Sequence, residues 1–156
     1  MRFPLKRILL VLGVAAVAGQ FIRPARNISA TPPGKDDLAT LYPTPPAVRH
    51  VLEVACYDCH SDNTRYPWYA GVQPVGWWLE NHIDDGKREL NFSEFGTYSA
   101  KRQGRKFGAI ADQLTDHTMP LKSYTWIHRD AALTDEQRNA LIDWAVALQD
   151  KIEGPN

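Results

Sequence analysis

The sequence predicts an all-α fold with long loops, and three observations favour that class. Three segments place apolar residues at helical spacing, and the clearest of them covers residues 134–152. No segment alternates apolar and polar residues as a half-buried strand does. The 156 residues contain no internal repeat, and their number suits one domain with an appendage.

The formal net charge of zero hides two unlike parts of the chain. Residues 1–26 contain five basic residues and no acidic one, which leaves 13 basic and 18 acidic residues from Asn27 onward, a net charge of −5. A mildly acidic body lacks the basic surface that neutralises phosphates, which argues against a nucleic-acid partner. An apolar content of 44% argues against general disorder, and two cysteines exclude a disulfide-rich scaffold.

Residues 1–26 are typical of a signal peptide or a membrane anchor. Basic residues precede an apolar run from Ile8 to Ala18, and small residues at positions 16 and 18 offer a cleavage point before Gly19. Extended to Ile22, the run is still shorter than the roughly 20 residues that cross a bilayer comfortably. We expect export to the periplasm, with residues 8–22 as a tether to the inner membrane if the leader is retained.

The exported part divides into a tether and a domain. Residues 27–44 are rich in proline, which denies the backbone a donor, so little regular structure is expected there. The domain is expected at 45–156. Its first helix carries Pro45 and Pro46 in the first turn and runs to Cys56, because residues 48, 51, 52 and 55 share one face.

Three further helices are expected in the domain. One covers Pro74 to Asp85 and is stopped by Gly86, and another covers about 99–116, with glycine interruptions at 104 and 108. The last begins at a capping box, Thr134 to Gln137, keeps one apolar face through residue 152 and ends at Gly154.

The segment Cys56-Tyr57-Asp58-Cys59-His60 has the C-x-x-C-H pattern through which c-type haem is attached. Two thiols three positions apart on one turn can each add across a vinyl group of the same porphyrin. The histidine that follows can give its imidazole to the iron. The pattern therefore predicts one covalently bound haem c, with His60 as an iron ligand.

Three other interpretations of the two cysteines are weaker. A thioredoxin-like dithiol opens a helix in a βαβ context, whereas this motif closes a helix and no strands are expected. A zinc site needs two more ligands at close spacing, but His117 and His128 are too far apart in sequence and no further cysteine exists. An exported C-x-x-C can also oxidise to a disulfide, in which case the adjacent His60 would be accidental.

Met119, in a proline-bearing loop between the third and fourth helices, is the favoured second axial ligand. His82, His117 and His128 compete with it, and an open or water-bound position is a further alternative; His50 fits a solvent-facing or structural role. Closed His/Met ligation suits one-electron transfer, so the sequence favours an electron carrier over an enzyme. The acidic body of such a carrier would be steered toward basic patches on redox partners. An open sixth position would instead suit a haem sensor or a peroxidase-like enzyme.

Aromatic residues follow the motif closely. We expect Trp68, Trp77 and Trp78 to line the haem pocket, since a porphyrin needs an apolar wall that excludes water; plain core aromatics are the alternative. Basic residues in the same region could pair with haem propionates or could be solvated surface charges; they are Arg65, Lys87 and Arg88.

The order and spacing of these motifs resemble the small bacterial haem-binding domain family, which is similar in general plan to cytochromes c. The likeness spans about residues 40–150. It covers the C-x-x-C-H run with Ser61, the segments 66–69, 74–78 and 90–95, His82, Met119-Pro120 with Tyr124 and His128, and the final helix with Trp144. The resemblance implies haem binding through Cys56, Cys59 and His60, and it implies no particular reaction or partner.

Overall fold

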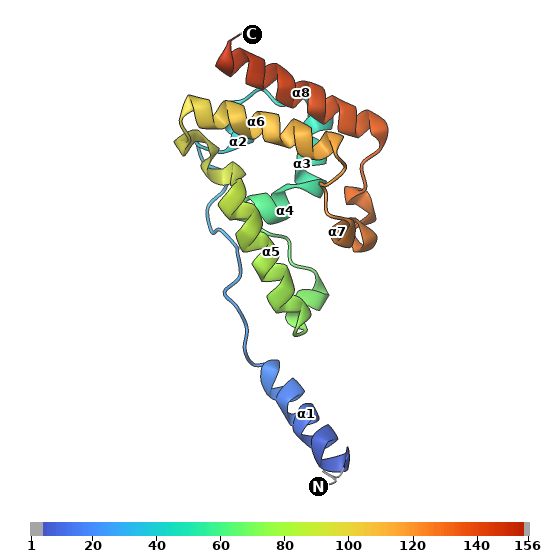
Figure 1. The fold of residues 1–156 in the computed structure, drawn as a ribbon. Helices are drawn as coiled ribbons and strands as arrows, with labels where there is room; N and C mark the ends of the chain where they lie inside the picture. The colour runs from blue at the N-terminus through green and yellow to red at the C-terminus, as the bar shows by residue number, and fades with distance from the viewer. Residues whose placement is uncertain (1–4, 155–156) are drawn as a thin grey trace.

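The computed structural model describes residues 5–154 and confirms the all-α class (Figure 1). Within those residues the only β-type pairing is an isolated bridge between Ile28 and Asn63. The elements in chain order are α1 (Leu5–Gly19), α2 (Leu38–Leu41), α3 (Pro46–Ala55), α4 (Tyr57–His60), η1 (Trp68–Gly71), α5 (Val75–Glu89), η2 (Phe92–Thr97), α6 (Ala100–Thr115), α7 (Lys122–Ile127), η3 (Arg129–Ala131) and α8 (Asp135–Glu153).

Helices α6 and α8 pack along each other and form the largest helix contact of the domain. The predicted capping box of α8 is confirmed, because Thr134 and Gln137 exchange side-chain and backbone hydrogen bonds. The two glycines that interrupt the apolar pattern of α6 lie against α8. A Cβ at Gly104 would meet the Glu153 side chain, and one at Gly108 would meet Gln149. In both cases the neighbouring atoms belong to a flexible side chain and not to the backbone of α8, and α6 continues through both glycines.

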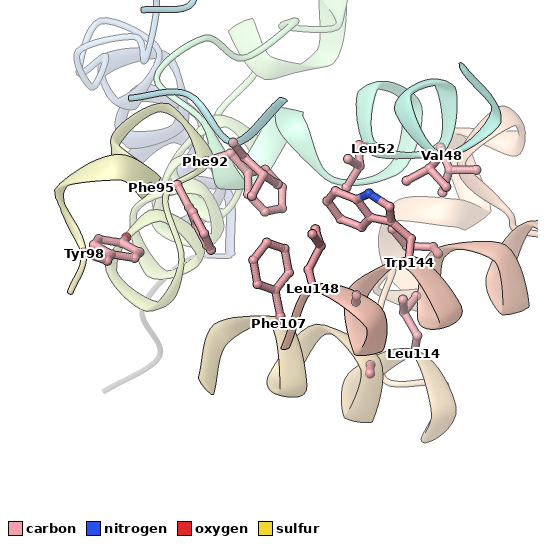
Figure 2. Close-up of a cluster of buried hydrophobic side chains, with 14 residues drawn as sticks. Val48, Leu52, Phe92, Phe95, Tyr98, Phe107, Leu114, Trp144 and Leu148 are labelled. Carbon is pink, nitrogen blue, oxygen red and sulfur yellow. The ribbon is translucent and has the colours of Figure 1, made fainter. Parts of the chain in front are cut away.

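The core lies between α3, η2, α6 and α8 and combines aliphatic side chains with a group of contacting aromatic ones (Figure 2). Phe92 and Phe95 of η2 and Phe107 of α6 are almost completely buried. Burying one such side chain contributes about 1.5–3 kcal/mol. Trp144 of α8 packs edge-on against Phe107, and its indole N–H donates to Pro43 O at 3.0 Å. The core thus fixes α3, and with it the start of the motif.

Residues 27–44 contain more structure than their proline content predicts. Asp37 caps the short helix α2 by accepting from Ala39 N at 2.9 Å, and Leu38 is completely buried in the core. The hydroxyl of Tyr57, inside the motif, donates to Asp37 at 3.2 Å. A few well-placed apolar and capping residues therefore attach the segment to the body at Asp37 and Leu38, whereas residues 30–35 are exposed.

One predicted helix end is wrong. Helix α5 does not stop at Gly86 but continues to Glu89, and Gly86 lies inside it at a close approach to the backbone of Cys59. Helix α1 spans the predicted apolar run and buries none of its residues. No helix in residues 5–154 has both the length and the apolar character needed to cross a membrane.

Candidate functional site

The motif folds into the single turn of α4, directly after α3. Cys56 ends α3, its backbone N–H donating to Leu52 O, and its own carbonyl accepts from the backbone N–H groups of Cys59 and His60. The two cysteines are half-buried and their thiols are free. One helical turn thus presents both thiols and the imidazole to the same side of the domain.

That side of the domain is hollowed by a cavity of about 560 Å³. This volume lies within the usual range for cofactor sites. Apolar side chains from α3, α6 and α8 form much of the wall, α5 contributes polar residues and Gly86, and the loop before α7 closes the cavity. The side chains of chemical interest in this wall are Cys56, Cys59, His60, His82, Lys106 and Met119.

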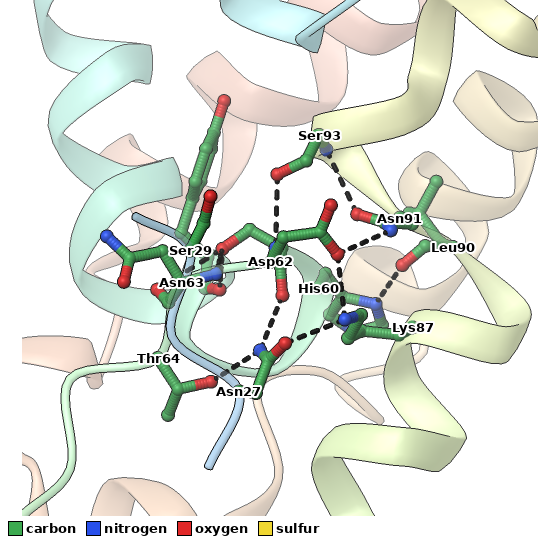
Figure 3. Close-up of polar contacts among 12 residues, drawn as sticks. Asn27, Ser29, His60, Asp62, Asn63, Thr64, Lys87, Leu90, Asn91 and Ser93 are labelled. Atoms are coloured by element: carbon green, nitrogen blue, oxygen red, sulfur yellow. Dashed lines mark hydrogen bonds and ion pairs between the residues drawn. The ribbon is translucent and has the colours of Figure 1, made fainter. Parts of the chain in front are cut away.

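The imidazole of His60 is held by the backbone that follows α5. Its Nδ1 lies 3.0 Å from Leu90 O, as Figure 3 shows. A carbonyl can only accept, so Nδ1 carries the proton and Nε2 keeps its lone pair. Burial lowers the pKa of His60, with Lys106 adding to the effect, and outweighs the backbone hydrogen bonds that raise it. His60 is therefore a neutral, oriented imidazole, as metal ligation requires.

The loop after the motif is anchored by a polar network beside His60 (Figure 3). Lys87 of α5 pairs with Asp62 at 2.7 Å and donates to the side chain of Asn27 at 2.7 Å. Asn27 in turn donates to Ser61 O at 2.8 Å, and Asn91 donates to Asp62 at 3.0 Å. The network ties α5, the motif loop and the start of the proline-rich segment together.

Both thiols are protonated in this environment. Burial raises the pKa of Cys56 to about 12 and that of Cys59 to about 11. The neighbouring Cys59 adds to the shift of Cys56, and the carboxylate of Asp58 adds to that of Cys59. Uncharged sulfur suits an apolar cavity.

Asp58, between the two cysteines, turns away from the cavity and fixes the motif from behind. It is 7% exposed and accepts from the backbone N–H and the guanidinium of Arg65, at 3.0 and 3.1 Å. It also accepts from the hydroxyl of Tyr124 at 2.7 Å. Tyr124 belongs to α7 and lines the cavity, so this carboxylate couples the motif to the far wall. No pattern in the sequence indicates this role of Asp58.

Met119 enters the cavity from the loop between α6 and α7. The loop folds back on α6, since the backbone N–H of Met119 donates to Gln113 O at 3.3 Å. From α8, Arg138 Nη1 donates to Leu114 O at 3.0 Å and to Met119 O at 3.3 Å. The Nε of Arg138 is buried without a partner among the described residues. Arg138 therefore braces the backbone of the methionine at some energetic cost.

Of the other histidines, His82 alone is in the described cavity wall. Its Nδ1 lies 2.9 Å from Trp78 O, and its ring packs against Trp78. His128 stacks on Tyr124 with ring centroids 4.2 Å apart. His117 and His50 are exposed at positions outside this wall.

The structure does not place the three predicted pocket tryptophans in the cavity wall. Trp68, Trp77 and Trp78 are exposed by 85, 36 and 47%, and none belongs to the wall among residues 5–154. The reason is position along α5: the wall uses its second half, residues 82, 85, 86 and 89, whereas the tryptophans lie at or before its first turn. This prediction needs correction, because nearness in sequence to the motif did not translate into nearness to the cavity.

The basic side chain in the described wall is Lys106 of α6, whose Nζ lies 3.9 Å from Glu89. Arg65, Lys87 and Arg88 pair instead with Asp58, Asp62 and Asp85. Lys106 shares a face of α6 with Ile110, four positions later, which also lines the cavity. In the sequence, the one sign that Lys106 faces the cavity is that a basic residue falls within the apolar face of this helix.

Comparison with known proteins agrees with this geometry. The profile of the haem-binding domain family matches residues 14–147. The chain belongs to the haem-binding domain family. No curated protein and no solved structure matches it. The domain binds haem, and the residues present fit that group: an apolar cavity of suitable size holds an oriented neutral imidazole, a thioether and two thiols.

Proposed function

We propose that this domain is a periplasmic monohaem c-type cytochrome that transfers single electrons. The cavity carries the proposal, because its wall unites Cys56, Cys59, His60 and Met119 although Met119 lies 59 residues beyond His60 in the sequence. The basic and apolar N-terminal segment supports export, since bacteria attach haem covalently outside the cytoplasm.

The two thiols would hold the cofactor covalently. In each attachment a C–S bond forms as the thiol adds across a vinyl double bond, and the thiol hydrogen moves to the neighbouring vinyl carbon. The addition is balanced without an oxidant. Cys56 and Cys59 suit it because they are free and protonated, and because Cys59 lies in α4 while Cys56 directly precedes that turn. Asp58 and its partners keep that turn in place behind the cavity.

The axial positions would be held by His60 and Met119. Haem supplies an iron that changes oxidation state by one electron. Leu90 O orients the ring of His60, and Arg138 holds the backbone of Met119. With both positions occupied, small molecules would not have free access to the iron, and rigid ligands in an apolar wall would favour electron transfer without ligand exchange. The net charge of −5 from Asn27 onward would steer the domain toward basic redox partners.

Ligand replacement tests this assignment against the alternatives. The protein, produced with a haem-maturation system, is compared with Met119→Ala and with His82→Ala, a second cavity-wall side chain that could ligate iron. The proposal predicts that CO binds the reduced Met119→Ala protein rapidly and that its reduction potential falls. The His82→Ala protein should behave as the wild type does.

Two outcomes would contradict the proposal. If only His82→Ala admitted CO, His82 would be the sixth ligand. If the wild type itself bound CO rapidly, the sixth position would be exchangeable, and a haem sensor or peroxidase-like activity would replace electron transfer.

A further inference from the structure

The three tryptophans absent from the cavity wall lie at one end of the domain, and we call Trp68, Trp77 and Trp78 the tryptophan tip. Trp68 belongs to η1, which packs against α5, and the other two lie in the first turn of α5. A single exposed apolar residue is ordinary, but three exposed tryptophans within eleven positions are not. Tryptophan is, with tyrosine, enriched where a protein meets the polar surface of a membrane.

Helix α1 ends at this tip and is fixed to it. Gln20 and Gln73 exchange two hydrogen bonds, at 3.2 and 3.0 Å, between the amide side chain of Gln20 and the backbone of Gln73. The indole N–H of Trp77 donates to Ile22 O at 2.8 Å, and Gly19 packs against the Trp77 ring. Figure 1 shows α1 projecting away from the body beyond this end of α5.

The surface of α1 indicates what covers it. Apolar side chains on every side of the helix are exposed, with values from 44% at Ile8 to 69% at Leu5. A protein groove covers one face of an amphipathic helix, whereas a bilayer covers a helix that is apolar all round. Lys6 and Arg7 lie at one end and Arg23 and Arg26 beyond the other, with no acidic residue in 1–26. This charge is complementary to anionic headgroups.

We propose that the tryptophan tip is a membrane-contact surface that rests in the headgroup region of an anionic phospholipid bilayer, with α1 in the acyl region beneath it. The proposal applies to the chain that retains α1 and does not depend on the axial ligands. Along the axis of α5, about 13 Å separate Trp77 from Gly86 in the cavity wall. Contact at the tip would therefore hold the haem cavity at a set height and orientation above the bilayer.

Quenching of tryptophan fluorescence by brominated lipid tests the contact. The full chain is bound to phosphatidylglycerol vesicles with and without bromine on the acyl chains, and binding is measured separately by flotation. Residues 1–26 contain no tryptophan, so any quenching reports on the body of the domain. The variant W68F/W77F/W78F removes the tip, and W126F is the control, because Trp126 is 72% exposed but lies on α7.

The proposal predicts that bromine quenches the wild type and W126F to the same extent. The triple variant should still float with the vesicles but lose the bromine-dependent quenching. Equal quenching in the triple variant and the wild type would overturn the proposal, as would a wild type that fails to float or floats without being quenched. If the triple variant does not fold, Trp68→Phe alone, at an 85% exposed position, must lower the quenched fraction; no decrease would contradict the tip contact.

Discussion

Gly86→Ala is the substitution for which the structure makes the sharpest prediction. Gly86 lies in the cavity wall where α5 crosses α4, and a Cβ there would be 2.6 Å from the carbonyl oxygen of Cys59 and 3.3 Å from its Cβ. The obstacle is the backbone of the motif, which cannot move aside as a flexible side chain can. The helices would have to separate, and the second thiol would move with them.

Two opposing effects set the size of the change. Alanine is favoured over glycine inside a helix by about 0.8–1.0 kcal/mol. Overpacking at a well-packed contact costs about 1–3 kcal/mol, and a contact at 2.6 Å belongs at the upper end of that range. We therefore expect Gly86→Ala to lower the free energy of unfolding by about 1–2 kcal/mol.

Gly108→Ala is the matched control, also inside a long helix. Its Cβ would meet only the end of the Gln149 side chain, at 2.9 Å, and that flexible group can turn away. The helix preference then dominates, and stability should stay level or rise by up to about 1 kcal/mol. Urea unfolding of the haem-loaded proteins measures both changes as midpoint shifts at constant slope. The same change in both variants, or a Gly86→Ala protein as stable as the wild type, would refute the reasoning.

Three other substitutions test the surroundings of the cavity. Asp58→Asn should cost about 1–3 kcal/mol in urea unfolding, because it weakens buried charge-assisted hydrogen bonds; a change of a few tenths would contradict that role. Arg138→Met should change the free energy of unfolding by no more than about 1 kcal/mol, because the substitution removes the unpartnered Nε together with the hydrogen bonds of Nη1. It should nevertheless speed CO binding, because the backbone of Met119 is no longer held. An unchanged rate would argue against this role of Arg138. Burial raises the pKa of Asp62, but Lys87 and Asn91 lower it more, so the net pKa is below the ordinary 3.8. The ionised Asp62 therefore stabilises the folded state fully above pH 3.8, and this stabilisation is lost as the pH falls through the lower pKa that Asp62 has in the folded protein. Asp62→Asn should remove this contribution to the decrease in stability in acid.

The parts of the fold predicted from sequence rest on local physical rules. The capping box at Thr134 is a contact among neighbours, and the apolar spacing of α3 and α6 reports directly which face is buried. The grouping of Cys56, Cys59 and His60 follows from one helical turn, so local sequence is sufficient for it. Met119 could be nominated because it is the one methionine besides the initiator and no apolar stripe includes it.

The remaining features depend on how distant segments pack. The cavity face of α5 carries His82, Asp85, Gly86 and Glu89, so a search for apolar periodicity does not find it. Because the sequence does not mark this polar face, it favours the nearby tryptophans as pocket residues. In the structure they lie a turn or more from the part of α5 that lines the cavity. Gly86 looks like a helix stop in sequence, and only the position of α4 explains why a glycine is needed inside the helix.

The covalent attachment of haem at Cys56 and Cys59 is the claim on which the account depends most. The direct measurement is the mass of the denatured protein after acid–organic extraction of any free haem, for protein produced with a haem-maturation system. We expect that the wild type keeps the mass of one haem and that the Cys56→Ala/Cys59→Ala variant keeps none. A wild type that releases all its haem into the organic phase would contradict it.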